Sequence, residues 1–193
     1  MYTCQIHVVY FVWTQSEGPL QENYRPIIQR NLDALLTNGI CGAASASSQF
    51  QCQIHPVVSA TSAEKRGHVM GHLREIIQSY VSDIPIEFTE GDGTGYEWPG
   101  INRVWEIGQN SRDQDLILYF HDKGVTHENY GRYINFLETT LLKQAPQIAN
   151  KFQNDKTILK LGFQAGSSGF LFYNWWWARV CIVHMYRNYH CYM

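Results

Sequence analysis

The chain has 193 residues, of which 45% are hydrophobic and 17% are charged, and its formal net charge at pH 7 is −2. These values are typical of one globular domain, here residues 1–193, with enough chain to bury a substantial core. A balance this close to neutral argues against a dedicated nucleic-acid binder, which normally carries a basic stripe, so no nucleic-acid partner is expected.

The cysteines and the N-terminal residues bear on the compartment. The five cysteines are spread along the chain with no C-x-x-C pair, which argues against a zinc knuckle and against a disulfide framework. We therefore expect reduced thiols and a cytoplasmic, reducing compartment. The first residues, MYTCQIHVVYFVW, carry no basic region and no small-residue cleavage site, so they predict a strand and not a signal peptide. No apolar run reaches the length of a membrane span.

Hydrophobic periodicity predicts alternating strands and helices in the first half of the chain. Residues 5–13 are rich in β-branched and aromatic side chains, which is typical of a buried strand. Pro56 lies within a second predicted strand and indicates an edge or a bulge. The elements expected after the first strand are a helix at 23–40, a strand at 51–60, a helix at 62–81 and a short strand at 84–90.

The second half continues this alternation. Pro99 suits the first turn of a helix over 98–110. The run Leu116–Phe120 has no apolar/polar alternation and predicts a strand covered on both faces. Further elements are expected as a helix at 130–144, a turn or helix at 146–152 and a strand at 157–163. The sequence therefore predicts an α/β chain, a single three-layer domain with a mainly parallel central sheet.

The apolar strand at 116–120 runs directly into His121, Asp122 and Lys123. Polar groups at the carboxyl end of a buried strand lie where open α/β sheets bind ligands. A carboxylate there can hold a divalent cation, and a lysine or imidazole can neutralise phosphate charge. An ordinary solvated turn explains the same residues equally well. Successive side chains alternate in direction, so at least one supports the turn, and we expect Asp122 to face the cleft.

A glycine-rich stretch, TEGDGTGYEWPGI, precedes the helix at 98–110. It is neither a P-loop nor a dinucleotide fingerprint, so a surface loop is the better interpretation of its glycines. Glu97 is a candidate functional residue because it lies between two aromatic residues at the mouth of that helix. The alternative is a carboxylate that complements the helix dipole.

The stretch FLFYNWWWARV places three consecutive tryptophans between Asn174 and Arg179. Three adjacent side chains cannot all face one core, so we expect at least one to line a cleft or contact a partner. A packed aromatic core is the alternative, and for any single tryptophan it is the better interpretation. His68 and His72 have the spacing of a helical metal pair, but the glutamate of an H-E-x-x-H motif is missing.

Four motifs in order resemble a family of small glycosyltransferase-like proteins of bacteria, algae and large viruses. The family patterns are YFxW, YE(Y/W)PGI, (L/I)YFH(S/T)KG and N(F/W)(F/W)WAR. The matching stretches of this chain are YFVW at 10–13, YEWPGI at 96–101, LYFHDKG at 118–124 and NWWWAR at 174–179. The chain departs from the family at Asp122, where relatives usually carry Ser or Thr, and no Asp-x-Asp signature follows this strand.

The resemblance implies a GT-A-like, Rossmann-like fold and a glycosyltransferase that moves a sugar from a nucleotide-diphosphate sugar to a glycan or glycoprotein acceptor. Asp122 is then the expected ligand of Mn²⁺ or Mg²⁺, and Glu97 the expected general base. The remaining expected roles are a nucleotide pocket shaped by Tyr10, Phe11 and Trp13, diphosphate charge offset by His121, Lys123 and Arg179, and a donor sugar oriented by Asn174.

Two other functions are compatible with the same residues. The first is a non-catalytic protein of glycosyltransferase-like fold that binds a glycan or nucleotide. The second is a metal-assisted hydrolase of nucleotide sugars. Release of nucleoside diphosphate that depends on an acceptor separates a transferase from both.

Overall fold

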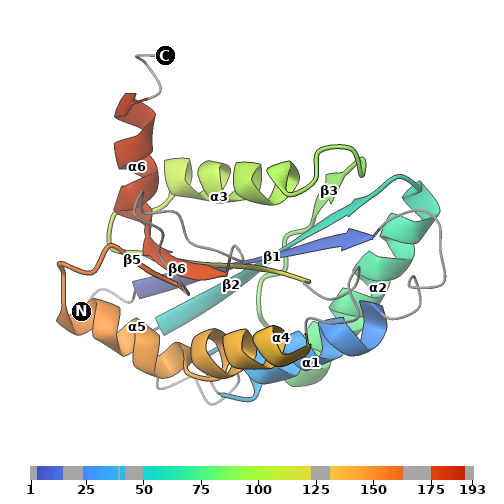
Figure 1. Ribbon diagram of the computed structural model, residues 1–193, viewed down its shortest axis with the longest axis horizontal. Coiled ribbons are helices and arrows are strands. Elements are labelled where there is room, and N and C mark those ends of the chain that lie inside the picture. The colour runs from blue at the N-terminus through green and yellow to red at the C-terminus, as the bar shows by residue number, and fades with distance from the viewer. Residues whose placement is uncertain are drawn as a thin grey trace.

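The central feature of the computed structural model is a six-stranded sheet with the strand order β3-β2-β1-β4-β6-β5 (Figure 1). The structure describes residues 4–14, 24–38, 40–41, 50–122, 131–162 and 175–189. The strands β1 to β4 pair in parallel, whereas β6 is antiparallel to both β4 and β5. The prediction of an α/β chain with a mostly parallel sheet is confirmed. The strands are β1 (Cys4–Thr14), β2 (Phe50–Ala60), β3 (Thr89–Gly91), β4 (Leu116–His121), β5 (Lys160–Gly162) and β6 (Trp176–Arg179).

Helices cover both faces of the sheet and complete three layers (Figure 1). One face packs against α1, α2, α4 and α5, and the other against α3 and α6. The helix predicted at 130–144 is an α-helix that continues as a π-helix. The helices are α1 (Tyr24–Leu36), α2 (Ala63–Tyr80), α3 (Trp98–Asn110), α4 (Gly131–Leu137) with the π-helix η4 (Glu138–Leu142), α5 (Ala145–Asn154) and α6 (Val180–Tyr189).

The unbroken apolar runs of β1 and β4 follow from burial on both faces. In β1, Ile6 and Val8 belong to the core under α1 and α2, while Val9 and Phe11 belong to the core under α3. None of these four side chains is more than 1% exposed. A strand with helices on both sides needs apolar residues at every position, which removes the alternation of a half-exposed strand. The two predicted strands lie side by side in one sheet and run parallel.

Pro56 lies in an inner strand and not at an edge. The backbone N–H and C=O of Ile54 both bond toward the segment before β3, to Pro85 and Glu87. Pro56 has the same parity, so its nitrogen faces the same side. Pairing of β2 with β3 begins only at Val57. The missing N–H of the proline therefore falls in a gap of that ladder, where no hydrogen bond is lost.

The strand predicted at 84–90 is shorter in the structure. Ile86 forms one isolated bridge with Ile54, and regular pairing is limited to Thr89–Gly91. Pro85 has no N–H to contribute to a ladder, which accounts for the interruption at the start of the predicted segment.

The sulfur chemistry differs from the expectation. Cys41 and Cys52 are joined by a disulfide, so the expectation of reduced thiols does not hold for this pair. Among the other described cysteines, Cys4 and Cys181 are free. A separate search of the described residues finds no helix long and apolar enough to cross a membrane.

Candidate functional site

The order of the strands reverses between β1 and β4. From β1 the chain moves outward through β2 and β3, and then returns to place β4 on the other side of β1. Such a reversal leaves a crevice beyond the carboxyl ends of the two strands, which is where open α/β sheets bind ligands. Trp13 and Thr14 end β1, and His121 ends β4. The polar break after β4 therefore lies at this switch point.

Asp122 joins the ends of the two strands. Its backbone N–H donates to the carbonyl of Phe11 at 3.1 Å, and its Oδ1 accepts from the backbone N–H of Trp13 at 3.1 Å. The residue is only 5% exposed. Its second oxygen, Oδ2, is buried and has no hydrogen-bond partner among the described residues. One oxygen of the carboxylate is thus used by the fold, and the other has no partner within the part of the chain that the structure describes.

Burial raises the pKa of Asp122 to about 7, and the nearby carboxylate of Glu97 adds to the rise. The hydrogen bond from the backbone of Trp13 opposes this shift because it favours the ionised form. Near neutral pH the side chain is therefore divided between an acid that can donate a hydrogen bond and a carboxylate that can bind a cation. A buried carboxyl group whose pKa is raised this far is a candidate functional group.

Glu97 and His121 form the second part of the site. Oε1 of Glu97 lies 3.6 Å from Nε2 of His121. Glu97 immediately precedes α3, and α3 begins close to the sheet because Gly100 lacks a side chain. A Cβ at Gly100 would lie 2.9 Å from the hydroxyl oxygen of Tyr119 and 3.0 Å from Cβ of Phe11. Glycine therefore allows the start of α3, with its carboxylate, to approach the ends of β1 and β4.

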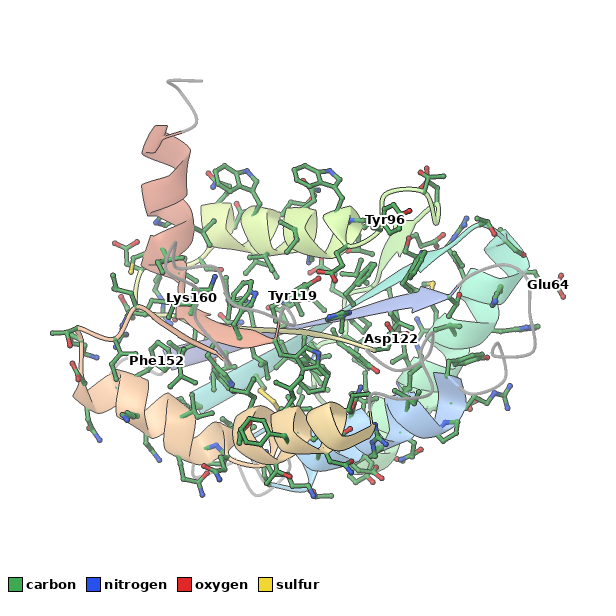
Figure 2. The ribbon with its side chains drawn as sticks, viewed as in Figure 1. Glu64, Tyr96, Tyr119, Asp122, Phe152 and Lys160 are labelled. Carbon is green, nitrogen blue, oxygen red and sulfur yellow. A yellow bond between two sulfur atoms is a disulfide. The ribbon has the colours of Figure 1, made fainter. Side chains whose placement is uncertain are left out.

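Aromatic rings border this site on the side of α3. Tyr96 is 72% exposed and Trp98 is 69% exposed. Tyr96 adopts φ 46°, a left-handed conformation that is uncommon for a residue with a large side chain. Its ring centroid lies 5.5 Å from that of Trp13, so Trp13 also reaches this border. Figure 2 shows Tyr96 at the end of α3 that faces β3, and Asp122 toward the carboxyl ends of β1 and β4.

Tyr119 was not identified from the sequence as a site residue. Its hydroxyl is buried and has no hydrogen-bond partner among the described residues. Burial raises the pKa of Tyr119 well above its usual value, and the charges of Glu97 and Asp122 contribute. In the sequence, Tyr119 is one more residue of an apolar strand. Only the structure distinguishes it from its neighbours, through a buried hydroxyl with no hydrogen-bond partner among the described residues.

Two residues expected to shape a nucleotide pocket are core residues. Tyr10 is fully buried, stacks on Phe120 with a centroid distance of 4.4 Å, and accepts a hydrogen bond from Asn31. Phe11 is 1% exposed and packs under α3. Of the YFVW motif, the structure therefore brings only Trp13 to the edge of the site.

Arg179 lies at the other end of the sheet. Because β6 is antiparallel to β4, Arg179 pairs with Leu116, the first residue of β4. Its guanidinium donates to the carbonyls of Phe152, Asp155 and Ile158, and so caps the last turn of α5. The structure does not bring Arg179 to Asp122. Two further expected site residues, Lys123 and Asn174, lie outside the described residues.

The three tryptophans are all buried, which corrects the expectation that one of them lines a cleft. Trp175 and Trp177 belong to the core under α1 and α2, and Trp176 belongs to the core under α3. Trp177 donates to the carbonyl of Leu141 at 3.1 Å. Alternation along a strand with two covered faces resolves the packing problem, since each face takes its own rings.

Among the described residues of the site, the possible metal ligands are the carboxylates of Asp122 and Glu97 and the imidazole of His121. The described residues contain no group of three or more His, Cys, Asp or Glu side chains that could hold a metal ion. Asp122 offers one orphaned oxygen, and Glu97 is close enough to influence its ionisation. One or two carboxylates suit Mg²⁺ when phosphate oxygens and water complete its shell. The described residues therefore suit a cation whose remaining ligands are phosphate oxygens and water.

An Asp-x-Asp triplet, Asp113 to Asp115, precedes β4 and lies away from the site. Asp115 is 2% exposed and accepts from the guanidinium of Arg112 at 2.9 Å. Asp113 pairs with His184 on α6 at 2.7 Å. Both carboxylates therefore stabilise the fold at the amino end of β4 through these partners.

Comparison of the chain with family models, curated proteins and solved structures finds no match.

Proposed function

We propose that the chain is a glycosyltransferase of GT-A-like fold that moves a sugar from a nucleotide-diphosphate sugar to a glycan or protein-linked acceptor. The observation that carries the proposal is the buried Asp122, whose Oδ2 has no hydrogen-bond partner among the described residues. It lies at the switch point between β1 and β4, where an α/β sheet binds nucleotides. A second carboxylate, Glu97, lies within reach of acceptors, since its side chain is 29% exposed.

The reaction transfers a glycosyl group between two oxygens. An acceptor hydroxyl loses its proton to Glu97 and bonds to the anomeric carbon, while the bond from that carbon to the diphosphate oxygen breaks. The nucleoside diphosphate leaves with the electron pair of that bond. Glu97 is the group placed for the proton because its carboxylate faces His121 at 3.6 Å. The imidazole orients the carboxylate and, when protonated, stabilises it as an anion.

Asp122 serves the diphosphate. In its protonated form Oδ2–H would donate a hydrogen bond to a phosphate oxygen, and in its ionised form Asp122 would hold Mn²⁺ or Mg²⁺. The bound cation would supply charge neutralisation for the diphosphate leaving group. Because a cation favours the carboxylate, its binding should release a proton from Asp122 near neutral pH.

A non-catalytic glycan-binding protein of the same fold is the second candidate. The exposed rings of Tyr96 and Trp98 favour it, because flat aromatic faces are suited to stacking against the C–H faces of sugars. These rings adjoin Glu97 in the chain, so they also suit an acceptor site. Turnover decides between the two functions.

The test is a screen of nucleotide sugars with and without Mn²⁺, followed by an assay of nucleoside diphosphate release in the presence of glycan acceptors. We expect release to require both donor and acceptor, and to be lost in Glu97→Gln and Asp122→Asn. Asp83→Asn is the matched control, because Asp83 is an exposed aspartate outside this site. Donor binding without turnover would favour the binding protein, and donor hydrolysis without acceptor would favour a hydrolase.

A further inference from the structure

A second hollow lies at the opposite end of the sheet, on the face covered by α3. It has a volume of about 360 Å³, and every residue that lines it is polar except Ile107. We call it the polar cleft and define it by His7 of β1, His55 of β2, and Arg103 and Ser111 of α3 and its end. His7 precedes Trp13 by six positions along β1, which corresponds to about 20 Å in a strand. The polar cleft is thus separate from the switch-point site.

A chain of hydrogen bonds runs along the floor of the polar cleft. Nη2 of Arg103 lies 3.0 Å from Nδ1 of His55. Nε2 of His55 lies 3.2 Å from Nδ1 of His7, and Nε2 of His7 lies 3.0 Å from Oγ of Ser111. The two imidazoles are 2% and 5% exposed. The chain therefore connects a guanidinium to a serine hydroxyl through two buried rings.

Arg103 fixes the direction of this chain. A guanidinium can only donate, so Nδ1 of His55 must accept, and its proton is carried on Nε2. That N–H donates to Nδ1 of His7, which in turn donates from Nε2 to Oγ of Ser111. Burial lowers the pKa of His55 to about 3, helped by the charge of Arg103, and burial also lowers the pKa of His7. Both rings are therefore neutral, and the hydroxyl of Ser111 is an acceptor toward His7 whose own proton is available to a ligand.

The packing of α3 against the sheet does not require these polar side chains. Val9 and Phe11 in β1 and Val57 in β2 lie on the same face as the two histidines, and all three are apolar core residues. Two buried imidazoles and a guanidinium replace that core only where the polar cleft opens. Nε of Arg103 is also buried without a hydrogen-bond partner among the described residues. The imidazoles satisfy one another through the chain, so this N–H is the group of the network that the described residues leave unsatisfied; burying such a donor is unfavourable, which points to a ligand.

The charges around the polar cleft define the chemistry of that ligand. Arg103 contacts Glu87 and Glu106, and Arg112 contacts Asp115. A phosphate would be repelled by the three carboxylates, and a protonated amine would be repelled by the two guanidiniums, so neither charge suits the polar cleft. A neutral hydroxyl can accept from a guanidinium and donate to a carboxylate at the same time. The lining is thus complementary to several hydroxyl groups on an uncharged molecule.

We propose that the polar cleft binds a neutral polyhydroxylated ligand, a monosaccharide or short oligosaccharide, through the hydroxyl of Ser111 and the carboxylates of Glu87 and Glu106. Its volume lies within the range of about 300–1,000 Å³ that is usual for small-molecule sites. The proposal does not depend on the switch-point site being catalytic, because no residue is shared between them.

The first experiment uses the wild-type protein and two-dimensional NMR. Methyl glycosides and short oligosaccharides of common hexoses are titrated, with inorganic phosphate and ethylamine as charged probes. We expect neutral sugars to shift the resonances of Ser111 and the ring nitrogens of His55, while the charged probes leave them in place. Selective shifts by phosphate or ethylamine, or no shift with any sugar, would overturn the proposal.

Ser111→Ala removes the hydroxyl that faces the ligand. Loss of one hydrogen bond should weaken sugar binding about fivefold, and Ser111→Thr should restore it because the hydroxyl is retained. Ser79→Ala is the matched control, since Ser79 is an exposed serine on α2, outside the polar cleft, whose hydroxyl donates to the carbonyl of Ile76. Equal sugar affinity of Ser111→Ala and wild type would contradict the proposed contact, whether or not the switch-point site turns over a donor.

Discussion

Asp122→Asn separates the role of Asp122 in the fold from its role in a ligand site. The substitution keeps the shape of the side chain and the oxygen that accepts from the backbone of Trp13. It removes a charge that the fold buries unfavourably. We expect the variant to gain stability relative to wild type as the pH rises, and to lose any activity that depends on cation or diphosphate binding.

The magnitude follows from the pKa. The carboxyl has a pKa of about 7 in the folded protein, against about 3.9 in an unfolded chain. The folded state therefore binds the proton more tightly, and the contribution of Asp122 to wild-type stability falls as the pH rises between these two values. Full ionisation corresponds to about 4 kcal/mol. Between about pH 5 and pH 8 the change is about 2–3 kcal/mol, and it is absent from the variant. The unpaired amide of asparagine lowers stability by about 1–3 kcal/mol at every pH.

The assay is urea and thermal unfolding of both proteins over that pH range, without divalent cations. The difference in stability should change by about 2–3 kcal/mol in favour of the variant, or about 5–10 °C in melting temperature for a chain of this size. Asp83→Asn, at an exposed position, should follow the wild type throughout. Parallel curves for wild type and Asp122→Asn would refute the reasoning, because they would mean that Asp122 ionises as a solvated carboxyl.

Three further substitutions test the packing around the two sites. Gly100→Ala should lower stability by about 1–3 kcal/mol in urea unfolding, because its Cβ would clash with β1 and β4. Arg179→Met should lower stability by about 2–4 kcal/mol, because carbonyls at the end of α5 lose their donor, and should leave nucleotide-sugar turnover per folded molecule unchanged. The contribution of His55 to stability should fall below about pH 6.5, because a buried neutral imidazole resists protonation. His55→Gln should remove this fall, which is up to about 1.4 kcal/mol per pH unit, whereas His68→Gln, at an exposed position, should not.

The sequence was sufficient for the layers of the fold and for one end of the site. Unbroken apolar runs identified β1 and β4, and their parallel pairing follows from the alternation of strands and helices. Once two strands are parallel, the residues that follow them must meet at one edge of the sheet. That is why Asp122 and Trp13 could be expected together. Glu97 was a candidate because it lies between two aromatic residues at the predicted start of α3, and only the family resemblance assigned it to the same site as Asp122.

The remaining site residues could not be placed from the sequence, because their positions depend on the direction of each strand and on which face each side chain points to. Arg179 was expected beside Asp122, but β6 is antiparallel to β4, so its last residue lies at the amino end of β4. Tyr10 and Phe11 lie close in sequence to a strand end, yet both are directed into the two cores. The pairing of Cys41 with Cys52 likewise depends on the path of a connecting segment and not on a spacing motif.

The two ends of the sheet carry buried ionisable groups whose effects on stability have opposite signs. The pKa of Asp122 is raised to about 7, so its contribution declines as the pH rises toward neutrality. The pKa of His55 is lowered to about 3, so its contribution declines as the pH falls below its unfolded value of about 6.5. Between about pH 4 and pH 6.5 the two changes nearly cancel, so the wild type should show little pH dependence from this pair, and each single variant should reveal the other group. The imidazole of His55 is not required by the packing of β2, because Val57 on the same face is an apolar core residue, whereas Asp122 bonds the end of β1 through one of its two oxygens. Oδ2 of Asp122 and Nε of Arg103 are buried without a hydrogen-bond partner among the described residues, one at each end of the sheet, so the two pH titrations probe the two proposed sites.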